Sequence, residues 1–293
     1  MYLCVHTNIF INTLTAMEAI KIDLNDYVQS GEGANGQSFN HKQDSAIMLK
    51  LYNKTAPYEI TESELCKAVK VYNAGIPTPR PGEFVTDGDG RYGIRFERIV
   101  GKKSFARAVS DDPANVETYA RDFAALCRQL HSTNVDKGEF PSIKEVDKRL
   151  LEQNPYFTDD EKAKVRAFID SVPDATTAIH GDLQYGNAIM VGDKRYFIDL
   201  GDFAYGHPYF DLGMVLLTTL YEDEGFLKEA FHLTPDVAAD FWHYFVKGYW
   251  GDDADEAVIE KMLLPYVGLK VLIIERDAKI FFPNYHKILM ENI

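Results

Sequence analysis

The chain has 293 residues, of which 46% are hydrophobic and 26% charged, and these proportions exclude a disordered chain, a collagen-like fibre and a coiled coil made only of repeats. Lysine and arginine number 31 against 45 acidic residues, so the formal charge is −14 and neither nucleic acid nor an anionic membrane is an expected partner. Three cysteines without CxxC spacing argue against a disulfide framework and a zinc site, which indicates a cytoplasmic protein.

The first third of the chain has the pattern of strands. Residues 45–52 predict a buried strand with a single charge, and residues 83–86 and 92–99 predict a hairpin joined by an Asp-Gly-Asp-Gly turn. Residues 1–16 are expected to be a dispensable extension, because polar side chains interrupt their apolar stretch and they lack the basic start of a signal peptide.

A helix is expected between the strand and the hairpin. Thr61 is a candidate N-cap with Glu64 three residues later, which forms a capping box. Leu65, Val69 and Tyr72 then recur at helical spacing. The Asn-Ala-Gly sequence that follows, and two prolines soon after it, end the helix.

The pattern becomes helical after Gly101. Asp112-Pro113 predicts a helix start, and the apolar residues that follow at a 3.6-residue period extend that helix to Leu130. A strand-like island occupies residues 188–198, and further helices are expected over 212–221, 237–250 and 256–278. We therefore predict an α+β protein with a strand-rich N-lobe over 17–100 and a mainly helical C-lobe over 101–293.

Three glycines, Gly31, Gly33 and Gly36, fit the pattern GxGxxG. In a dinucleotide-binding fold the third glycine opens a helix, whereas a glycine loop between two strands lies over nucleotide phosphates in kinases. A strand follows here, which favours the kinase arrangement over the dehydrogenase, and an ordinary glycine hairpin is the simpler alternative.

Lys50 is the one charge in the predicted strand 45–52. A buried lysine needs a phosphate or a carboxylate partner. Glu64 and Glu62 on the following helix are both candidates, and a solvated strand face is the alternative.

The segment His-Gly-Asp-Leu-Gln-Tyr-Gly-Asn, residues 180–187, precedes a predicted hairpin that ends near Asp199. Pairing of the two strands would bring Asn187 and Asp199 together at the hairpin base, with Asp182 just upstream. Oxygen ligands in this arrangement suit Mg²⁺. Asp182 as a loop cap and a hydrolytic metal site are the alternatives, and the latter gives Lys50 no role.

Together these motifs resemble the aminoglycoside/choline phosphotransferase family, small-molecule kinases of the protein-kinase-like fold, over roughly residues 25–280. The resemblance implies that Lys50, held by Glu64, binds the phosphates of ATP or GTP and that Asp182 is the catalytic aspartate. It implies Mg²⁺ ligands at Asn187 and Asp199. It also implies a hinge that offers backbone groups to the base, at Phe96, Glu97, Arg98 and Ile99, and an aspartate, Asp211, that ties the catalytic loop to the next helix.

The predicted acceptor is therefore a hydroxyl of a small molecule. Only eleven residues separate Asp199 from Asp211, which leaves little room for the peptide-docking segment of a protein kinase. A nucleotide-binding pseudoenzyme is the non-enzyme alternative, but every implied catalytic residue is present. Acidic clusters at 222–224 and 252–256 favour a cationic acceptor, although acidic residues at helix ends are often simply solvated.

Overall fold

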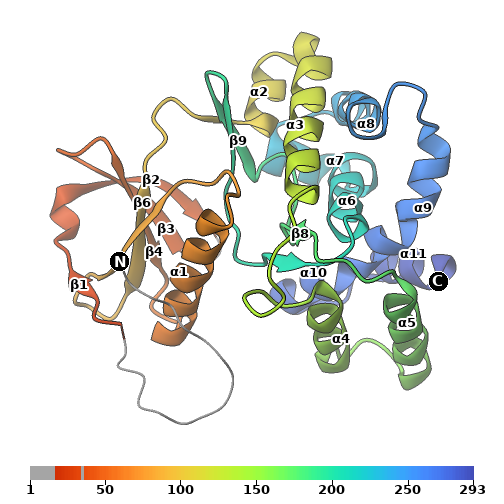
Figure 1. The fold of residues 1–293 in the computed structure, drawn as a ribbon, viewed down its shortest axis with the longest axis horizontal. Coiled ribbons are helices and arrows are strands. Elements are labelled where there is room, and N and C mark those ends of the chain that lie inside the picture. Colours follow the sequence, from red (N-terminus) through yellow and green to blue (C-terminus); the bar gives the residue numbers. More distant parts are fainter. Residues whose placement is uncertain (1–16, 34–35) are drawn as a thin grey trace. The chain divides into compact units, whose positions relative to one another are not determined.

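The computed structural model describes residues 17–33 and 36–293, so the predicted extension over 1–16 lies outside the described residues. The chain divides into two compact units (Figure 1). The first contains the chain up to Lys102 together with Val191–Gly201, and the second contains Lys103–Met190 and Asp202–Ile293. The first is rich in strands and the second mainly helical, which confirms the predicted α+β class.

The first unit is built on a six-stranded sheet in the order β1-β5-β6-β4-β3-β2. The β1–β5 pair is parallel, and the other neighbours are antiparallel. Its elements are β1 (Ile20–Lys21), the 3₁₀ turn Leu24–Asp26, β2 (Tyr27–Gly33), β3 (Gly36–His41), β4 (Ile47–Tyr52), α1 (Tyr58–Asn73), β5 (Pro81–Thr86) and β6 (Tyr92–Glu97). The predicted central strand is therefore β4, and the predicted hairpin is β5–β6.

Helix α1 begins earlier than the capping pattern predicts. It starts at Tyr58, directly after Pro57, and Thr61 lies buried inside it, so the predicted N-cap at Thr61 is wrong. The Tyr58 ring packs edge-on against two aromatic rings of the β5–β6 hairpin, and this packing draws the preceding turn into the helix. Tyr72 is also misplaced by the pattern, because it is 41% exposed while Val71 is buried.

The second unit is a helical body with short strands (Figure 1). Its α-helices are α2 (Phe105–Asp111), α3 (Val116–His131), α4 (Ile143–Gln153), α5 (Asp159–Ser171), α6 (Tyr209–Leu216), α7 (Glu224–Phe226), α8 (Pro235–Trp250), α9 (Glu256–Leu269), α10 (Val271–Ala278) and α11 (Pro283–Asn292). A 3₁₀ turn spans Pro113–Asn115, and π-helical turns span Leu217–Tyr221 and Leu227–Phe231. Phe123 of α3 packs against Phe241 and Phe245 of α8, which places an aromatic core between these helices.

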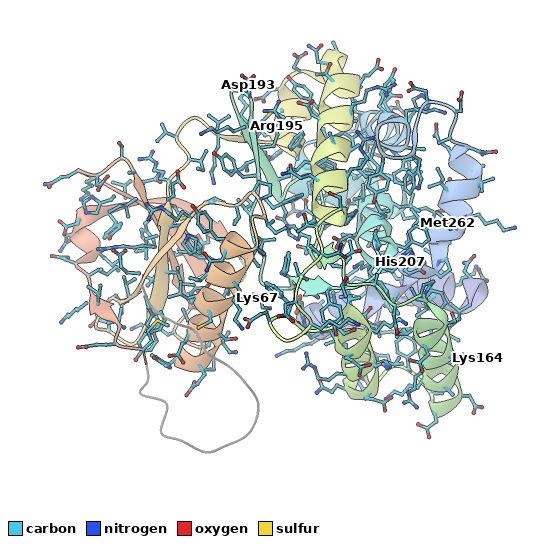
Figure 2. The ribbon with its side chains drawn as sticks, in the orientation of Figure 1. Lys67, Lys164, Asp193, Arg195, His207 and Met262 are labelled. Atoms are coloured by element: carbon cyan, nitrogen blue, oxygen red, sulfur yellow. The ribbon has the colours of Figure 1, made fainter. Side chains whose placement is uncertain are left out.

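Short strand pairs frame the loop at residues 180–187. β8 (Ala178–Ile179) pairs with β11 (Ala204–Tyr205), and β7 (Lys103–Ser104) pairs with β9 (Ala188–Val191). The chain leaves the second unit through β9 and turns at Gly192 and Asp193 into β10 (Lys194–Phe197), as the sequence predicts. Figure 2 labels Asp193 at this turn.

Two of the predicted C-terminal helices differ in detail. Residues 256–278 form two helices that meet at Lys270, and residues 217–221 continue α6 as a π-helical turn. Helices α4, α5 and α11 were not predicted. In the described part of the chain, none of the helices combines the length and the apolar character that a membrane crossing requires.

Candidate functional site

The three glycines of the predicted loop lie on paired strands, and residues 34–35 between them lie outside the described residues. Gly33 of β2 pairs with Gly36 of β3, and β3 leads directly to β4, so a helix does not follow the third glycine. A Cβ atom at Gly36 would strike the backbone carbonyl of Leu51 on β4, which explains the glycine there. The strand–loop–strand order excludes the dinucleotide-binding arrangement.

Lys50 lies on β4 and is held by two carboxylates of the same unit. Its Nζ atom is 2.8 Å from Glu64 Oε1 on α1 and 3.3 Å from Asp199 Oδ1. Glu62, the alternative partner, accepts instead from the Tyr58 hydroxyl and from the Met17 amide. The structure therefore decides the pairing of Lys50 in favour of Glu64.

The charges around Lys50 outweigh the effect of its burial. Burial alone lowers the pKa of a lysine, but the carboxylates of Asp199 and Glu64 raise the pKa of Lys50 above its ordinary value. The side chain is 27% exposed, so the ammonium group remains open to a further anion. A cation fixed by two acids, with one side still accessible, can bind phosphate oxygens.

Asp199 has an unusual backbone conformation for a residue with a side chain. Its φ of 58° lies in the left-handed region, which aspartate tolerates better than most residues. Its side chain is 58% exposed although it pairs with Lys50, and Lys67 of α1, labelled in Figure 2, donates to the nearby Gly201 carbonyl. Such a conformation, held by neighbouring contacts, is typical of functional segments.

Lys67 was not singled out from the sequence. It lies three residues after Glu64 on α1, so the two side chains share one face of the helix, and that spacing was the available signal.

The predicted hinge contains the last two residues of β6, Phe96 and Glu97, and the two residues that follow the strand. The amide of Glu97 donates to the Arg80 carbonyl at 2.9 Å, and the amide of Arg98 donates to the Ala46 carbonyl at 2.8 Å. Of the four residues of the predicted hinge, Glu97 and Arg98 therefore use their amides within the first unit.

The predicted catalytic aspartate and the predicted amide ligand are hydrogen-bonded to each other in the second unit. Asn187 Nδ2 donates to Asp182 Oδ2 at 2.8 Å and to the Asp182 carbonyl at 3.0 Å. Both bonds use the nitrogen, so the amide oxygen of Asn187 is the atom suited to a cation. The predicted site residues are thus divided between the units, with Asp182 and Asn187 in the second and Lys50, Glu64 and Asp199 in the first.

Asp211, at the start of α6, holds the beginning of the catalytic loop. Its carboxylate accepts from the amides of His180 and Gly181 at 2.7 and 2.9 Å, and His131 Nε2 lies 3.1 Å from it. Burial alone would raise the pKa of Asp211, but His131, followed by His180 and Lys270, outweighs burial, so the pKa is lowered. These hydrogen bonds connect the loop at residues 180–187 to helix α6, which is the role that the resemblance implies for Asp211.

A second charged group reaches the same loop from the α9–α10 junction. Lys270, only 4% exposed, has its Nζ atom 3.4 Å from the Gly181 carbonyl. Burial raises the pKa of Asp147 on α4 to about 7, with Lys270 lowering it and Asp202 raising it. The sequence analysis did not select Lys270, although a single lysine inside an apolar helical run was a signal of the same kind as Lys50.

The two acidic clusters are largely engaged in local interactions. Asp223 and Asp255 cap helices α7 and α9, and Glu222 accepts from the Tyr285 hydroxyl at 2.7 Å. Asp252 pairs with Arg121, and Glu256 pairs with His243. These contacts fit the structural interpretation of both clusters, as acidic residues at helix ends.

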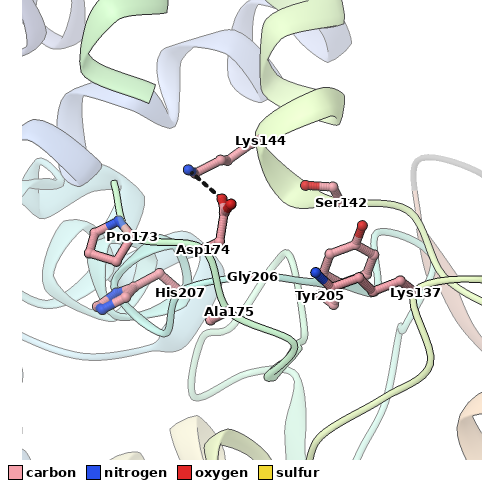
Figure 3. Close-up of a pocket in the computed structure, with 9 residues that line it drawn as sticks. All are labelled: Lys137, Ser142, Lys144, Pro173, Asp174, Ala175, Tyr205, Gly206 and His207. Carbon is pink, nitrogen blue, oxygen red and sulfur yellow. Dashed lines mark hydrogen bonds and ion pairs between the residues drawn. The ribbon is translucent and has the colours of Figure 1, made fainter. Parts of the chain in front are cut away.

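Neither a hollow nor a cluster of metal-binding side chains adds a further candidate site to the described residues. A hollow beside the start of α4 is lined by groups such as Lys144, Asp174 and His207, and none of the predicted site residues lines it (Figure 3). Within residues 17–33 and 36–293, no three His, Cys, Asp or Glu side chains gather so as to hold a metal by themselves. A magnesium ion needs no such cluster, because it takes one or two protein ligands together with phosphate oxygens and water.

Comparisons with known proteins bear on the family and the fold of this chain. The model of the phosphotransferase enzyme family matches residues 31–260, while no curated protein sequence matches the chain. An amicoumacin kinase in complex with AMP-PNP, Ca²⁺ and Ami has a similar structure, with a TM-score of 0.59 at 15% identity over 94% of this chain and 88% of that one.

Two further solved structures are similar. A thermostable mutant of an aminoglycoside phosphotransferase, in ternary complex with AMP-PNP and hygromycin B, gives a TM-score of 0.59 at 12% identity over 90% of this chain and 93% of that one. A choline/ethanolamine kinase family protein from Mesorhizobium loti gives 0.54 at 15% identity over 91% and 85%. These likenesses confirm the predicted protein-kinase-like fold.

Proposed function

Because this chain belongs to the phosphotransferase enzyme family, we propose that it transfers the γ-phosphoryl group of ATP or GTP to a hydroxyl group of a small molecule, with Mg²⁺ as the metal. The observation that carries the proposal is the pairing of Lys50 with both Glu64 and Asp199. A hydrolytic metal site gives no role to a lysine held in this way, whereas phosphoryl transfer needs a fixed cation beside a metal-binding carboxylate.

The nucleotide is assigned to groups of the first unit. Backbone amides of the β2–β3 hairpin, at Gly31, Gly33 and Gly36, lie over the phosphates in this proposal, and Lys50 neutralises part of their charge. The amide of Ile99 and the carbonyl of Glu97 bond the base, since the Glu97 and Arg98 amides are committed elsewhere.

The metal is assigned to Asn187 and Asp199. Both present oxygen atoms suited to a hard cation, because Asn187 uses its nitrogen for Asp182 and more than half of the Asp199 side chain is exposed. Asn187 and Asp199 would hold the metal, and Mg²⁺ bound there would offset the charge that develops on the transferred phosphoryl group. The left-handed backbone at Asp199 fixes the direction of that carboxylate.

Asp182 orients the acceptor hydroxyl in this proposal. An aspartate carboxylate is a weak base at neutral pH, so its main contribution is to accept a hydrogen bond and align the oxygen for in-line attack. Asn187 donates to one of the Asp182 carboxylate oxygens at 2.8 Å, which helps to fix the direction of the carboxylate. As the bond from the acceptor oxygen to the γ-phosphorus forms, the bond from that phosphorus to the bridging oxygen breaks, the nucleoside diphosphate leaves, and the hydroxyl proton passes to Asp182.

In this proposal the acceptor is a hydroxyl compound of the kinds after which the similar kinases are named. Those names include aminoglycosides and the choline/ethanolamine class, so amine-bearing compounds enter this proposal beside neutral sugars and hydroxy amino acids. The local engagement of both acidic clusters gives no preference for the amines.

The test is a transfer screen. The protein is incubated with γ-labelled ATP or GTP, Mg²⁺ and a library of amino-sugars, amino-alcohols, sugars and hydroxy amino acids, with EDTA and Asp182→Asn as controls. The proposal expects transfer to at least one acceptor class that both controls abolish. Labelled product at equal rates with EDTA or with Asp182→Asn contradicts the mechanism, and failure to bind either nucleotide in the presence of Mg²⁺ contradicts the function.

A further inference from the structure

Tyr185 lies inside the catalytic loop, between Asp182 and Asn187, and it is completely buried. Its hydroxyl donates to the Thr218 carbonyl at 2.8 Å, and its own carbonyl accepts from the Ala106 amide at 3.0 Å. One residue of the loop is therefore fixed from two directions by elements that lie far from it in the sequence.

The Thr218 carbonyl is available because the helix changes its hydrogen-bond pattern there. In a continuing α-helix this carbonyl would accept from the amide of Glu222, four residues later. The segment Leu217–Tyr221 is π-helical instead, and the Glu222 amide donates to the Leu217 carbonyl at 3.0 Å. The carbonyl left without its helical donor is buried, and the Tyr185 hydroxyl satisfies it.

The turn that carries Tyr185 also carries the ligand pair. The Asn187 amide donates to the Gln184 carbonyl at 2.9 Å, and the Gly186 amide donates to the Gln184 side chain at 2.6 Å. A shift of Tyr185 therefore moves Asn187, and with it the hydrogen bond to Asp182. We propose that Tyr185 is a positioning residue: its bond to the Thr218 carbonyl fixes the catalytic loop in the geometry that phosphoryl transfer requires. This inference rests on the proposed function.

Tyr185→Phe isolates this hydrogen bond. The ring packs against Phe231 and Phe241, with centroids at 4.4 and 5.0 Å, and phenylalanine keeps that packing while it removes the hydroxyl. The matched control is Tyr156→Phe, because the Tyr156 hydroxyl also donates to a backbone carbonyl, that of Lys279, at 3.1 Å.

The first measurement is steady-state kinetics, at a temperature where all variants are folded, with an acceptor from the transfer screen. We expect Tyr185→Phe to lower kcat about tenfold with KM for the nucleotide within about twofold, because a small misplacement of catalytic groups costs rate more than ground-state binding. Tyr156→Phe should retain the wild-type kcat. A Tyr185→Phe kcat equal to that of the control overturns the proposal.

The second measurement does not depend on activity. Amide hydrogen exchange, followed by mass spectrometry in the full chain, should be faster in Tyr185→Phe for the peptide covering residues 182–188 and unchanged there in Tyr156→Phe. Unchanged exchange in that peptide overturns the positioning role, even if the melting temperature falls. A wild-type protein that neither transfers phosphate nor binds Mg-nucleotide refutes the proposed function, while the exchange experiment still tests the loop.

Discussion

At the scale of single residues, two glutamates on one turn of α1 have different partners. Glu64 reaches Lys50 at 2.8 Å, whereas Glu62 bonds the Tyr58 hydroxyl and the Met17 amide at 2.9 Å each. The two residues have the same chemistry and lie on the same helix. They therefore provide a test of the Lys50 assignment in which only the partner differs.

We expect Glu64→Gln to lower kcat/KM for the nucleotide about tenfold, because Lys50 loses one of the two charges that fix its position. Glu62→Gln should change kcat/KM by less than about twofold. Steady-state kinetics with varied nucleotide and fixed acceptor measures both. Equal losses in the two variants would refute a specific role for Glu64.

The buried carboxyl of Asp147 should make the free energy of unfolding depend on pH. Burial raises its pKa to about 7 in the folded protein, above the ordinary aspartate value. A carboxyl whose pKa is raised by folding contributes stability that is complete below the unfolded pKa and is lost as the pH rises through about 7. The free energy of unfolding should therefore fall between pH 5 and pH 8, by up to ~3 kcal/mol from this group.

The variant Asp147→Asn should reduce this dependence. Urea unfolding at pH 5 and pH 8 measures the difference in free energy, and the exposed Asp240→Asn serves as a control that should leave it unchanged. An Asp147→Asn protein that loses as much stability across this range as the wild type would show that Asp147 does not titrate there.

At the scale of elements, the catalytic loop is held by groups from three other segments. Asp211 of α6 accepts from the amides of His180 and Gly181, Lys270 contacts the Gly181 carbonyl, and Tyr185 reaches the π-helical turn. Gly181 has a φ of 91°, and a side chain there would strike the backbone of Asp202. This part of the loop therefore tolerates little change in sequence.

Asp211→Asn should destabilise the protein by about 3–5 kcal/mol, because its buried partners lose a charged acceptor and one amide donor now faces other donors. Urea unfolding at pH 7 measures the loss. The pKa of Asp211 is lowered by folding, so its contribution is present above the unfolded pKa and disappears as the pH falls through the folded pKa. A loss below about 1 kcal/mol, typical of an exposed pair, would contradict this account.

The sequence predicted those elements whose pattern is local. The strand over 47–52, the hairpin of β5 and β6 and the apolar face of α3 all follow from periodicity and turn residues. The start of α1 does not follow from the local pattern, because the packing of Tyr58 against the hairpin determines where the helix begins. The π-helical turn after α6 could not be predicted, because its stability depends on Tyr185, a residue distant in sequence.

For the site, the motifs predicted the residue types and one important pairing, that of Lys50 with Glu64. Lys50, Glu64 and Asp199 lie together, as do Asp182 and Asn187, and Asp211 holds the loop. Lys67, Tyr185 and Lys270 were not selected. Each contacts a backbone carbonyl distant in sequence, and although both lysines carried a sequence signal, no pattern identified the carbonyl that each would contact.

At the scale of the whole molecule, each of the two compact units is made of two separate stretches of the chain. Val191–Gly201 belongs to the first unit although it follows most of the helices, because Phe197 donates to the Pro77 carbonyl at 2.7 Å and Asp199 pairs with Lys50. A single boundary near Gly101 could not reveal this. The chain thereby supplies the metal-binding aspartate of our proposal to the unit that carries Lys50.

The overall charge makes the fixed cations important. A protein with a net charge of −14 repels a triphosphate at long range, so local positive groups and Mg²⁺ must offset that repulsion. In our proposal Lys50 and the metal provide this, and Asp182 takes no part in it. Binding of the nucleotide and transfer of its phosphate therefore depend on different residues.

The separation of nucleotide binding from phosphate transfer is tested most directly by calorimetric titration of AMP-PNP into the wild-type protein, Asp182→Asn and Asp199→Asn. Each protein is titrated with and without Mg²⁺. Such a binding measurement requires no knowledge of the acceptor. We predict that Asp182→Asn binds within about threefold of the wild type and retains the gain in affinity from Mg²⁺, while Asp199→Asn loses most of that gain. If Asp199→Asn keeps the full effect of Mg²⁺, or Asp182→Asn alone abolishes it, the assignment of metal and acceptor roles is contradicted.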